Sequence, residues 1–263
     1  MRVLFFGDVV GRIGRKAIKK HLEKLVNKYH IDFVIANGEN VTHGKGLNEK
    51  HYNELIDAGV DCITLGNHYL SKSDINNYID DATCLVRPLN ILSNFGGTGS
   101  ILFDVGGVKV RVSNILGTAF MKEEVSNPYL SLKSLLDNEE PSIHIVDFHA
   151  EATGEKVCFG YAFDGQVSAV LGTHTHVQTN DARILENGTA YISDVGMCGA
   201  YNGVLGFEKH SVMNKTLFGS ESRFIIDEND VEQINAVVID IDEMTYKCKE
   251  FFSIKIVGDN NGK

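Results

Sequence analysis

Side chains that can bind metal ions recur just after short apolar stretches of this sequence. "RVLFF" at 2–6 and "SAVLG" at 168–172 are two such stretches, and both have the length and composition of a buried strand. In an open α/β sheet the carboxyl ends of the strands line the ligand crevice, so we expect the side chains that follow these strands to meet there. They are Asp8, Glu39, Asn40, Asn67, His149, His174 and His176, which follow five predicted strands.

His174 and His176 lie two positions apart in "GTHTH". On an extended segment, residues i and i+2 point to the same face, so we expect both imidazoles to reach one metal ion or two adjacent ions. Taken alone, such a pair is more often two exposed turn histidines than a metal site. The carboxylates and amides at four other strand ends favour the metal site.

The types of side chain restrict the metal. No thiolate belongs to the set, which excludes a structural zinc site of the cysteine type. Imidazole, carboxylate and amide oxygen together suit Mn²⁺, Fe or Mg²⁺, with Zn²⁺ possible. About seven ligands are too many for one tetrahedral ion, but they fit two divalent ions about 3.5–4 Å apart, bridged by a carboxylate and a water.

The elements that must position these side chains begin with a β-α-β-α-β series. An apolar strand at 2–7 is followed by a helix over about 12–29, a strand from 31, a helix over 48–60 capped by Asn48, and a strand from 61. This order predicts a parallel sheet with right-handed crossovers.

The rest of the chain adds further strands and two helices. We predict a hairpin turning at Gly106-Gly107, helices over 127–138 and 154–163, and strands that end at His149 and at the "HTH" histidines. Three more β-like segments lie at 189–196, 231–242 and 251–257. The simplest interpretation is one α/β domain over residues 1–263, with two sheets.

Composition and charge exclude several function classes. The chain has 263 residues, 43% of them hydrophobic, and a formal net charge of −10. This acidic surface argues against a stable nucleic-acid complex, which would need many cations to displace counterions. The first residues lack the pattern of a signal peptide, no apolar run is long enough to span a membrane, and the five cysteines are scattered. We therefore expect a cytoplasmic protein without a membrane partner.

Five motifs in order carry a resemblance to a known family. "GDVVG", "NGEN", "GNH", "FHAEATGEK" and "GTHTHVQTND" together are similar to the YmdB-type metallophosphoesterases, a branch of the calcineurin-like superfamily. The resemblance implies a four-layer αββα sandwich, a dinuclear metal site, and a phosphodiesterase that acts on a small phosphodiester such as a 2′,3′-cyclic nucleotide. It also implies a homo-oligomer.

Carried over by motif, the resemblance implies a role for each ligand. Asp8 and His176 would hold the first ion, Glu39 would bridge, and the second ion would be held by Asn67, His149 and His174. The wider superfamily begins with Asp-x-His, whereas the third position here is Val10. The missing ligand makes Asn40, beside Glu39, the expected substitute.

The implied mechanism is attack on phosphorus by a hydroxide that bridges the two ions. His68, next to Asn67, is placed to protonate the leaving oxygen or to stabilise its charge. The alternative for His68 is a histidine that only supports the ligands. Lys45, in the glycine-containing loop "THGKGLN" at 42–48, is a candidate contact to substrate phosphate, although such loops are more often solvated surface.

Two other functions compete with this hypothesis. The spacing G-x-x-x-G-x-x-G from Gly7 to Gly14 resembles a dinucleotide fingerprint weakly, which would suit a nucleotide-dependent oxidoreductase. Alternatively, the protein is regulatory and binds a phosphorylated ligand with little turnover. Asp181 and Asp194 are further candidates, as partners of the site histidines.

Overall fold

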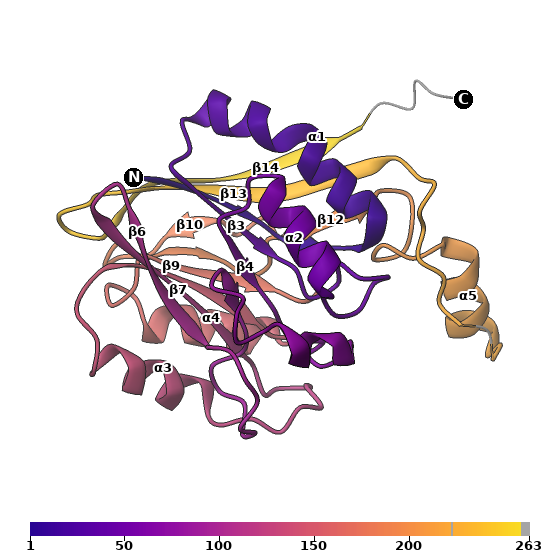
Figure 1. The fold of residues 1–263 in the computed structure, drawn as a ribbon, viewed down its shortest axis with the longest axis horizontal. Coiled ribbons are helices and arrows are strands. Elements are labelled where there is room, and N and C mark those ends of the chain that lie inside the picture. The colour runs from indigo at the N-terminus through magenta and orange to yellow at the C-terminus, as the bar shows by residue number, and fades with distance from the viewer. Residues whose placement is uncertain (222, 259–263) are drawn as a thin grey trace.

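A computed structural model describes residues 1–221 and 223–258 of the chain. The predicted domain, residues 1–263, therefore includes residue 222 and residues 259–263, which lie outside these ranges. Two β-sheets stack at the centre of the molecule, and helices cover their outer faces (Figure 1). Within the described ranges, no helix combines the length and hydropathy needed to cross a bilayer.

The first sheet has eight strands in the order β2-β12-β13-β1-β3-β4-β5, with β14 paired to β13. The pairs β1·β3, β3·β4 and β4·β5 are parallel, as the β-α-β-α-β series predicts, and β13 runs antiparallel to β1. The strands are β1 Arg2–Phe6, β2 Asp8–Val9, β3 Phe33–Asn37, β4 Cys62–Thr64, β5 Leu85–Val86, β12 Met197–Ala200, β13 Glu232–Ile241 and β14 Cys248–Val257.

The second sheet has six strands in the order β10-β11-β9-β8-β7-β6. The predicted hairpin joins β6 to β7, and both residues of its turn, Gly106 and Gly107, have positive φ angles of 60° and 91°. The strands are β6 Ser100–Val105, β7 Val108–Leu116, β8 Ile143–His149, β9 Ala169–Thr173, β10 Arg183–Ile184 and β11 Ala190–Ile192.

The predicted helices all form, and Asn48 caps the second by accepting a hydrogen bond from the backbone N–H of His51. One α-helix, α5, was not predicted, and it stands apart from both sheets (Figure 1). Its apolar side chains Met213, Leu217 and Phe218 remain exposed, so it lacks the buried face that a sequence pattern reveals. The helices are α1 Gly11–Tyr29, α2 Glu49–Asp57, α3 Pro128–Leu136, α4 Thr153–Ala162 and α5 Lys209–Phe218, with a short 3₁₀ helix at Ser73–Asn77.

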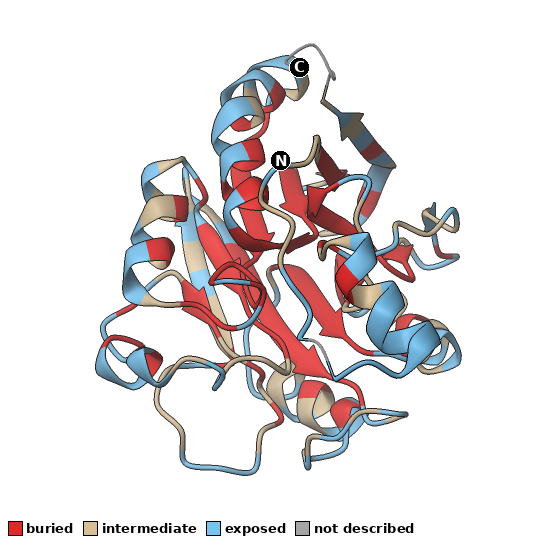
Figure 2. Cartoon of the chain, turned by 90° about the vertical axis from the view of Figure 1, so that its right-hand side faces the viewer, coloured by how far each residue is buried: buried red, intermediate tan, exposed pale blue. Residues whose placement is uncertain are grey.

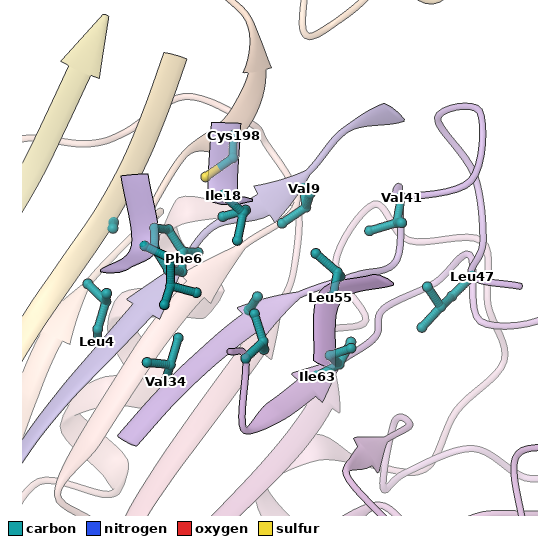
Figure 3. Close-up of a cluster of buried hydrophobic side chains, with 14 of the residues drawn as sticks. Leu4, Phe6, Val9, Ile18, Val34, Val41, Leu47, Leu55, Ile63 and Cys198 are labelled. Atoms are coloured by element: carbon teal, nitrogen blue, oxygen red, sulfur yellow. The ribbon is translucent and has the colours of Figure 1, made fainter. Parts of the chain in front are cut away.

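Three hydrophobic clusters separate the layers. On β1, Leu4 and Phe6 pack against α1 and α2 on the outer side (Figure 3), whereas Val3 and Phe5 face the second sheet, as the two-residue period of a strand requires. A third cluster, which includes Phe159 of α4, joins the second sheet to α3 and α4. The strands are accordingly buried while the helices expose one side (Figure 2). The order of layers is αββα, which confirms the predicted fold class.

Candidate metal centre

All seven predicted ligands come together where the two sheets present the carboxyl ends of their strands. Asp8 follows β1, and Glu39 and Asn40 follow β3 in the first sheet; His149 ends β8 in the second sheet. These four side chains are buried. The other three, Asn67, His174 and His176, lie on turns after β4 and β9 and are half-buried.

The first group of ligand atoms surrounds one nitrogen of His149. Its Nε2 atom lies 3.0 Å from Asn67 Oδ1, 3.0 Å from His174 Nδ1 and 3.3 Å from Glu39 Oε2. The potential ligand atoms of Glu39, His149 and His174 all lie within 4.8 Å of one another. Such mutual distances suit side chains that share a metal ion.

The second group lies beside the first, around Asp8. Its Oδ1 atom lies 3.9 Å from His176 Nε2 and 4.0 Å from His149 Nδ1, while Oδ2 accepts a hydrogen bond from the backbone N–H of His174 at 3.1 Å. Oδ1 is fully buried and has no hydrogen-bond partner in the described part of the chain. A buried carboxylate oxygen without a donor calls for a cation.

The outer ring nitrogens of the three histidines are all engaged by neighbours. Nδ1 of His176 lies against the carbonyl oxygen of Leu205. A carbonyl oxygen can only accept a hydrogen bond, so this ring nitrogen carries a proton. Such outer contacts fix the orientation of the rings and point the other ring nitrogens into the site, the usual arrangement around a bound metal. The outer contacts are His149 Nδ1 to Thr173 Oγ1 at 2.9 Å, His174 Nε2 to Glu151 Oε2 at 3.1 Å, and His176 Nδ1 to Leu205 O at 3.1 Å.

The electrostatics of the cluster favour positive charge at its centre. Burial lowers the pKa of His149, but the carboxylates of Glu39 and Asp8 outweigh this effect and raise it to about 9. Burial raises the pKa of Asp8 to about 6 even though the two nearby histidines oppose the rise. The buried carboxylates of Glu39 and Asp8 thus stabilise a positive charge at this point. The donor set of nitrogen and oxygen atoms fits a divalent metal.

A layer of polar side chains lies directly beneath the ligands. The buried carboxylate of Asp147 accepts hydrogen bonds from Asn37 at 2.9 Å, Thr64 at 2.5 Å and Thr173 at 2.6 Å. Since the Thr173 hydroxyl donates to Asp147, it accepts the Nδ1 proton of His149. Sequence reasoning missed this layer. The available signal was the polar residue on each strand's inward face, near the end of the strand.

The extended segment predicted for His174 and His176 does not form. His174 and His176 do not extend β9, which ends at Thr173; both have positive φ angles, 103° and 66°. Positive φ is uncommon for residues with a side chain and occurs often at functional sites. The two rings therefore reach different ligand groups through a turn and not through strand alternation.

Asp181 and Asp194 do not contact a site histidine ring. Asp194 instead accepts from Lys156 Nζ at 2.8 Å and from the backbone N–H of Thr175 at 2.9 Å, which fixes the turn between the two histidines. Asp181 accepts from the hydroxyls of Thr179 and Ser193.

The "GNH" motif places a glycine where no side chain fits. A Cβ atom at Gly66 would lie 2.3 Å from Glu39 Oε2 and 2.6 Å from His149 Nε2. The backbone N–H of His68 donates to Glu39 Oε2 at 3.0 Å. Burial lowers the pKa of the half-buried His68 ring, and the ammonium of exposed Lys45 lowers it further, whereas Glu39 opposes the decrease. The 42–48 loop therefore carries its positive charge within electrostatic reach of His68.

Asn40 presents its amide nitrogen, not its oxygen, to the site. Nδ2 lies 2.8 Å from Glu39 Oε1 and 3.1 Å from His176 Nε2. Coordination through Oδ1 requires the amide to rotate by half a turn. Val10, at the position of the histidine of the wider superfamily, is buried and occupies the N-cap position of α1 without a side-chain capping hydrogen bond.

The glycines from Gly7 to Gly14 serve packing. A Cβ atom at Gly7 would lie 1.9 Å from the carbonyl oxygen of Gly196, and one at Gly14 would lie 2.4 Å from that of Cys198. The backbone of β12 and the residue before it thus fill the space next to these glycines. The oxidoreductase hypothesis needs that space for a pyrophosphate, so the structure removes its main support.

Comparisons with known proteins agree on one family. The family model of the YmdB-like protein matches residues 4–254. A 2′,3′-cyclic-nucleotide 2′-phosphodiesterase of Bacillus subtilis is 44% identical over 263 residues, which cover 99% of this chain and 98% of that protein. The crystal structure of a phosphatase from Mycoplasma pneumoniae has a TM-score of 0.93 and 42% identity, with 99% and 95% of the two chains covered. A hypothetical protein from Thermus thermophilus has a TM-score of 0.92 and 36% identity, with coverage of 98% and 100%.

Proposed function

Because the chain belongs to the YmdB-like family, we propose that it is a metal-dependent phosphodiesterase that hydrolyses small phosphate esters, with 2′,3′-cyclic nucleotides as substrates. The family and the names of the relatives support a phosphoric-ester hydrolase. The observation that carries the metal dependence is the convergence of histidine nitrogens and carboxylate oxygens at one point. The Bacillus relative's printed name supports the cyclic-nucleotide substrate.

In this proposal the chain holds two divalent ions, iron or manganese before magnesium or zinc. Glu39 lies between the two ligand groups and is the bridging residue. Asn40 coordinates the same ion as Asp8 and His176 once its amide has rotated. When bound, the ions neutralise the phosphoryl oxygens and activate a water for attack on phosphorus. The groups are Asp8, Asn40 and His176 for one ion and Asn67, His149 and His174 for the other.

The chain's own residues then handle the substrate. The His68 ring makes no hydrogen bond within the described ranges, so it is free to meet an ester oxygen. Its pKa is lowered by burial, and the negative charge of an approaching phosphate opposes that effect. His68 therefore donates a proton at the leaving oxygen or stabilises its charge. Lys45, on its exposed loop, attracts the anion.

Two variants test the proposal with purified protein, metal analysis and hydrolysis of 2′,3′-cyclic AMP. Glu39→Ala should lose metal and activity together, because both ligand groups meet this carboxylate. His68→Ala should keep its metal and lose turnover by about 10²–10⁴-fold, the usual contribution of a general acid. The controls are Glu186→Ala and His210→Ala, which change exposed side chains elsewhere.

Each outcome bears on one assignment. Two ions per chain in Glu39→Ala would refute the bridging role. Unchanged turnover in metal-loaded His68→Ala would refute the acid. Two features stay predictions, the cytoplasmic location and the homo-oligomer, and light scattering of the purified protein tests the second.

A further inference from the structure

A cavity of about 280 Å³ opens directly beside the metal centre. His176 belongs to both: its Nε2 atom faces Asn40 and Asp8, and its ring also lines the cavity. The other walls come from the turn after His176, the segment that follows β12, and the strands β13 and β14. A molecule whose phosphate lies at the metal centre can therefore extend past His176 into this space.

The inward face of β13 changes from apolar to polar side chains where it meets the cavity. Val237 and Ile239 on this face belong to the apolar cluster between the sheets. Gln233 and Asn235 occupy the next two positions of the same face and line the cavity, although both are buried. Buried polar side chains need hydrogen-bond partners, and Gln233 Nε2 finds one in the carbonyl oxygen of Ala200 at 3.5 Å.

Asn235 has unused hydrogen-bonding capacity. Its Nδ2 donates to the carbonyl of Met197 at 2.9 Å. Its Oδ1 is buried and has no hydrogen-bond partner among residues 1–221 and 223–258. Native proteins leave few buried polar atoms unpaired, and each such atom calls for an explanation such as a ligand. Because Asn235 lines the cavity, a ligand bound there can donate the missing hydrogen bond to Oδ1.

The rim of the cavity carries an aromatic ring and a cation. Tyr201 is 44% exposed, and the ammonium of Lys255 lies 5.8 Å from the centre of its ring. Lys255 is the partner of Asn235 in the β13·β14 pairing, so the amide and the amine lie side by side on neighbouring strands. Lys255 forms no ion pair with any residue that the structure describes. An exposed ring, an ammonium without an ion-pair partner and polar amides around a small space are the groups that bind a flat heterocycle.

We propose that this cavity, the base pocket, binds the nucleobase of a nucleotide whose phosphate lies at the metal centre. Tyr201 stacks on the base, while Lys255 and Asn235 contact its polar edge. The volume is at the lower limit for small-molecule sites, which suits a single base and excludes a peptide or a folded nucleic acid. This inference rests on the proposed function, because it takes the phosphate at the metal centre as given.

The experiment compares two substrates that differ only in the base. They are 2′,3′-cyclic AMP and the 2′,3′-cyclic phosphate of methyl riboside, which has the same reacting group without a base. In Tyr201→Ala, the ratio of kcat/KM for the nucleotide to that for the base-free ester should fall by at least about 5-fold, which is the lower end of the loss expected when base stacking is removed. The change should appear mainly in KM. Lys255→Ala should lower the ratio by less.

Matched controls are available on the same molecule. Tyr161 is also exposed beside a cation, with the Arg183 guanidinium 5.8 Å from its ring, and it lies on α4 away from the pocket. Lys249 lies on β14 like Lys255, but its Nζ atom forms an ion pair with Asp240 Oδ1 at 3.5 Å. Tyr161→Ala and Lys249→Ala should leave the ratio unchanged.

The outcomes separate this inference from the proposed function. An unchanged ratio in Tyr201→Ala, or an equal loss on both substrates, would overturn the base pocket while leaving the phosphodiesterase intact. If the wild-type protein hydrolyses neither substrate, the proposed function fails. The base pocket is then tested by calorimetry with adenosine 3′-monophosphate and inorganic phosphate. Weaker nucleotide binding in Tyr201→Ala with unchanged phosphate binding supports it, and equal nucleotide binding overturns it.

Discussion

His144 and His149 lie on the same strand, β8, five positions apart, and both are fully or almost fully buried. Their environments nevertheless shift their pKa values in opposite directions. Burial, assisted by the charge of Arg111, lowers the pKa of His144 to about 3. The pKa of His149 is raised to about 9, because nearby carboxylates outweigh the effect of burial. Position on a strand is therefore not what makes a histidine chemically active.

The difference comes from the face of β8 on which each ring lies. His144 shares the outer face with Val146 and Phe148, which pack toward α3 and α4. Among residues 1–221 and 223–258, the one hydrogen-bond partner of its Nε2 atom is the hydroxyl of Ser113, at 2.9 Å. His149 lies on the inward face, where the first sheet brings Asp8 and Glu39 against it. A histidine opposite carboxylates from another sheet lies where a cation is favoured, whereas one buried beside a hydroxyl and a guanidinium stays neutral.

Exchanging each histidine for glutamine is the strongest test of this contrast. His149→Gln should lose metal and reduce activity by more than about 100-fold, exceeding the loss expected when only a supporting residue around a metal is changed. His144→Gln should keep metal and activity and lose about 1–3 kcal/mol of unfolding free energy, because a buried hydrogen bond is disturbed. Metal analysis, hydrolysis of 2′,3′-cyclic AMP and urea unfolding measure the three quantities.

The comparison would fail if both variants behaved alike. Equal losses of metal would mean that β8 as a whole, and not one face of it, supports the centre. Equal retention of metal would remove His149 from the ligand set.

Asp147 provides the next test, because it lies on the inward face two positions before His149. Asparagine has one acceptor oxygen where the carboxylate has two, so Asp147→Asn should leave one of the threonine donors unpaired and release the His149 ring. Metal affinity should fall by about 10–100-fold, as for other residues that orient metal ligands. A metal titration measures the change, and Asp104→Asn on the exposed β6–β7 hairpin is the control. Unchanged affinity would show that Thr173 alone positions the ring.

The same contrast explains which parts of the molecule could be predicted from the sequence. Each predicted ligand follows an apolar strand, and parallel strands bring their carboxyl ends together. The pattern of each strand and this one topological rule therefore sufficed to predict that these side chains lie together. Asp147 was missed because its partners Asn37, Thr64 and Thr173 come from three other strands. The α5 helix was missed because its apolar residues are exposed. Contacts across the sheets depend on register, which no single strand encodes.

The smallest expected effect concerns stability at low pH. The pKa of His144 is about 3 in the folded protein and 6.5 for an ordinary histidine. Below pH 6.5 the unfolded chain therefore binds a proton that the folded protein does not accept, so stability is complete above pH 6.5 and decreases as the pH falls. From pH 7.5 to 5.5 this single group should cost about 1.4 kcal/mol.

Urea unfolding of the wild-type protein and His144→Gln at these two pH values isolates the contribution. His149 acts with the opposite sign: its raised pKa means that the folded protein binds a proton more tightly, so its contribution to stability is present at low pH and is lost as the pH rises from 6.5 through about 9. Because both proteins retain His149, its effect cancels in the difference between them. The wild-type protein should therefore lose about 1.4 kcal/mol more than the variant. An equal loss in the two proteins would mean that His144 is protonated in the folded state, and the distinction between the two faces of β8 would then not rest on charge.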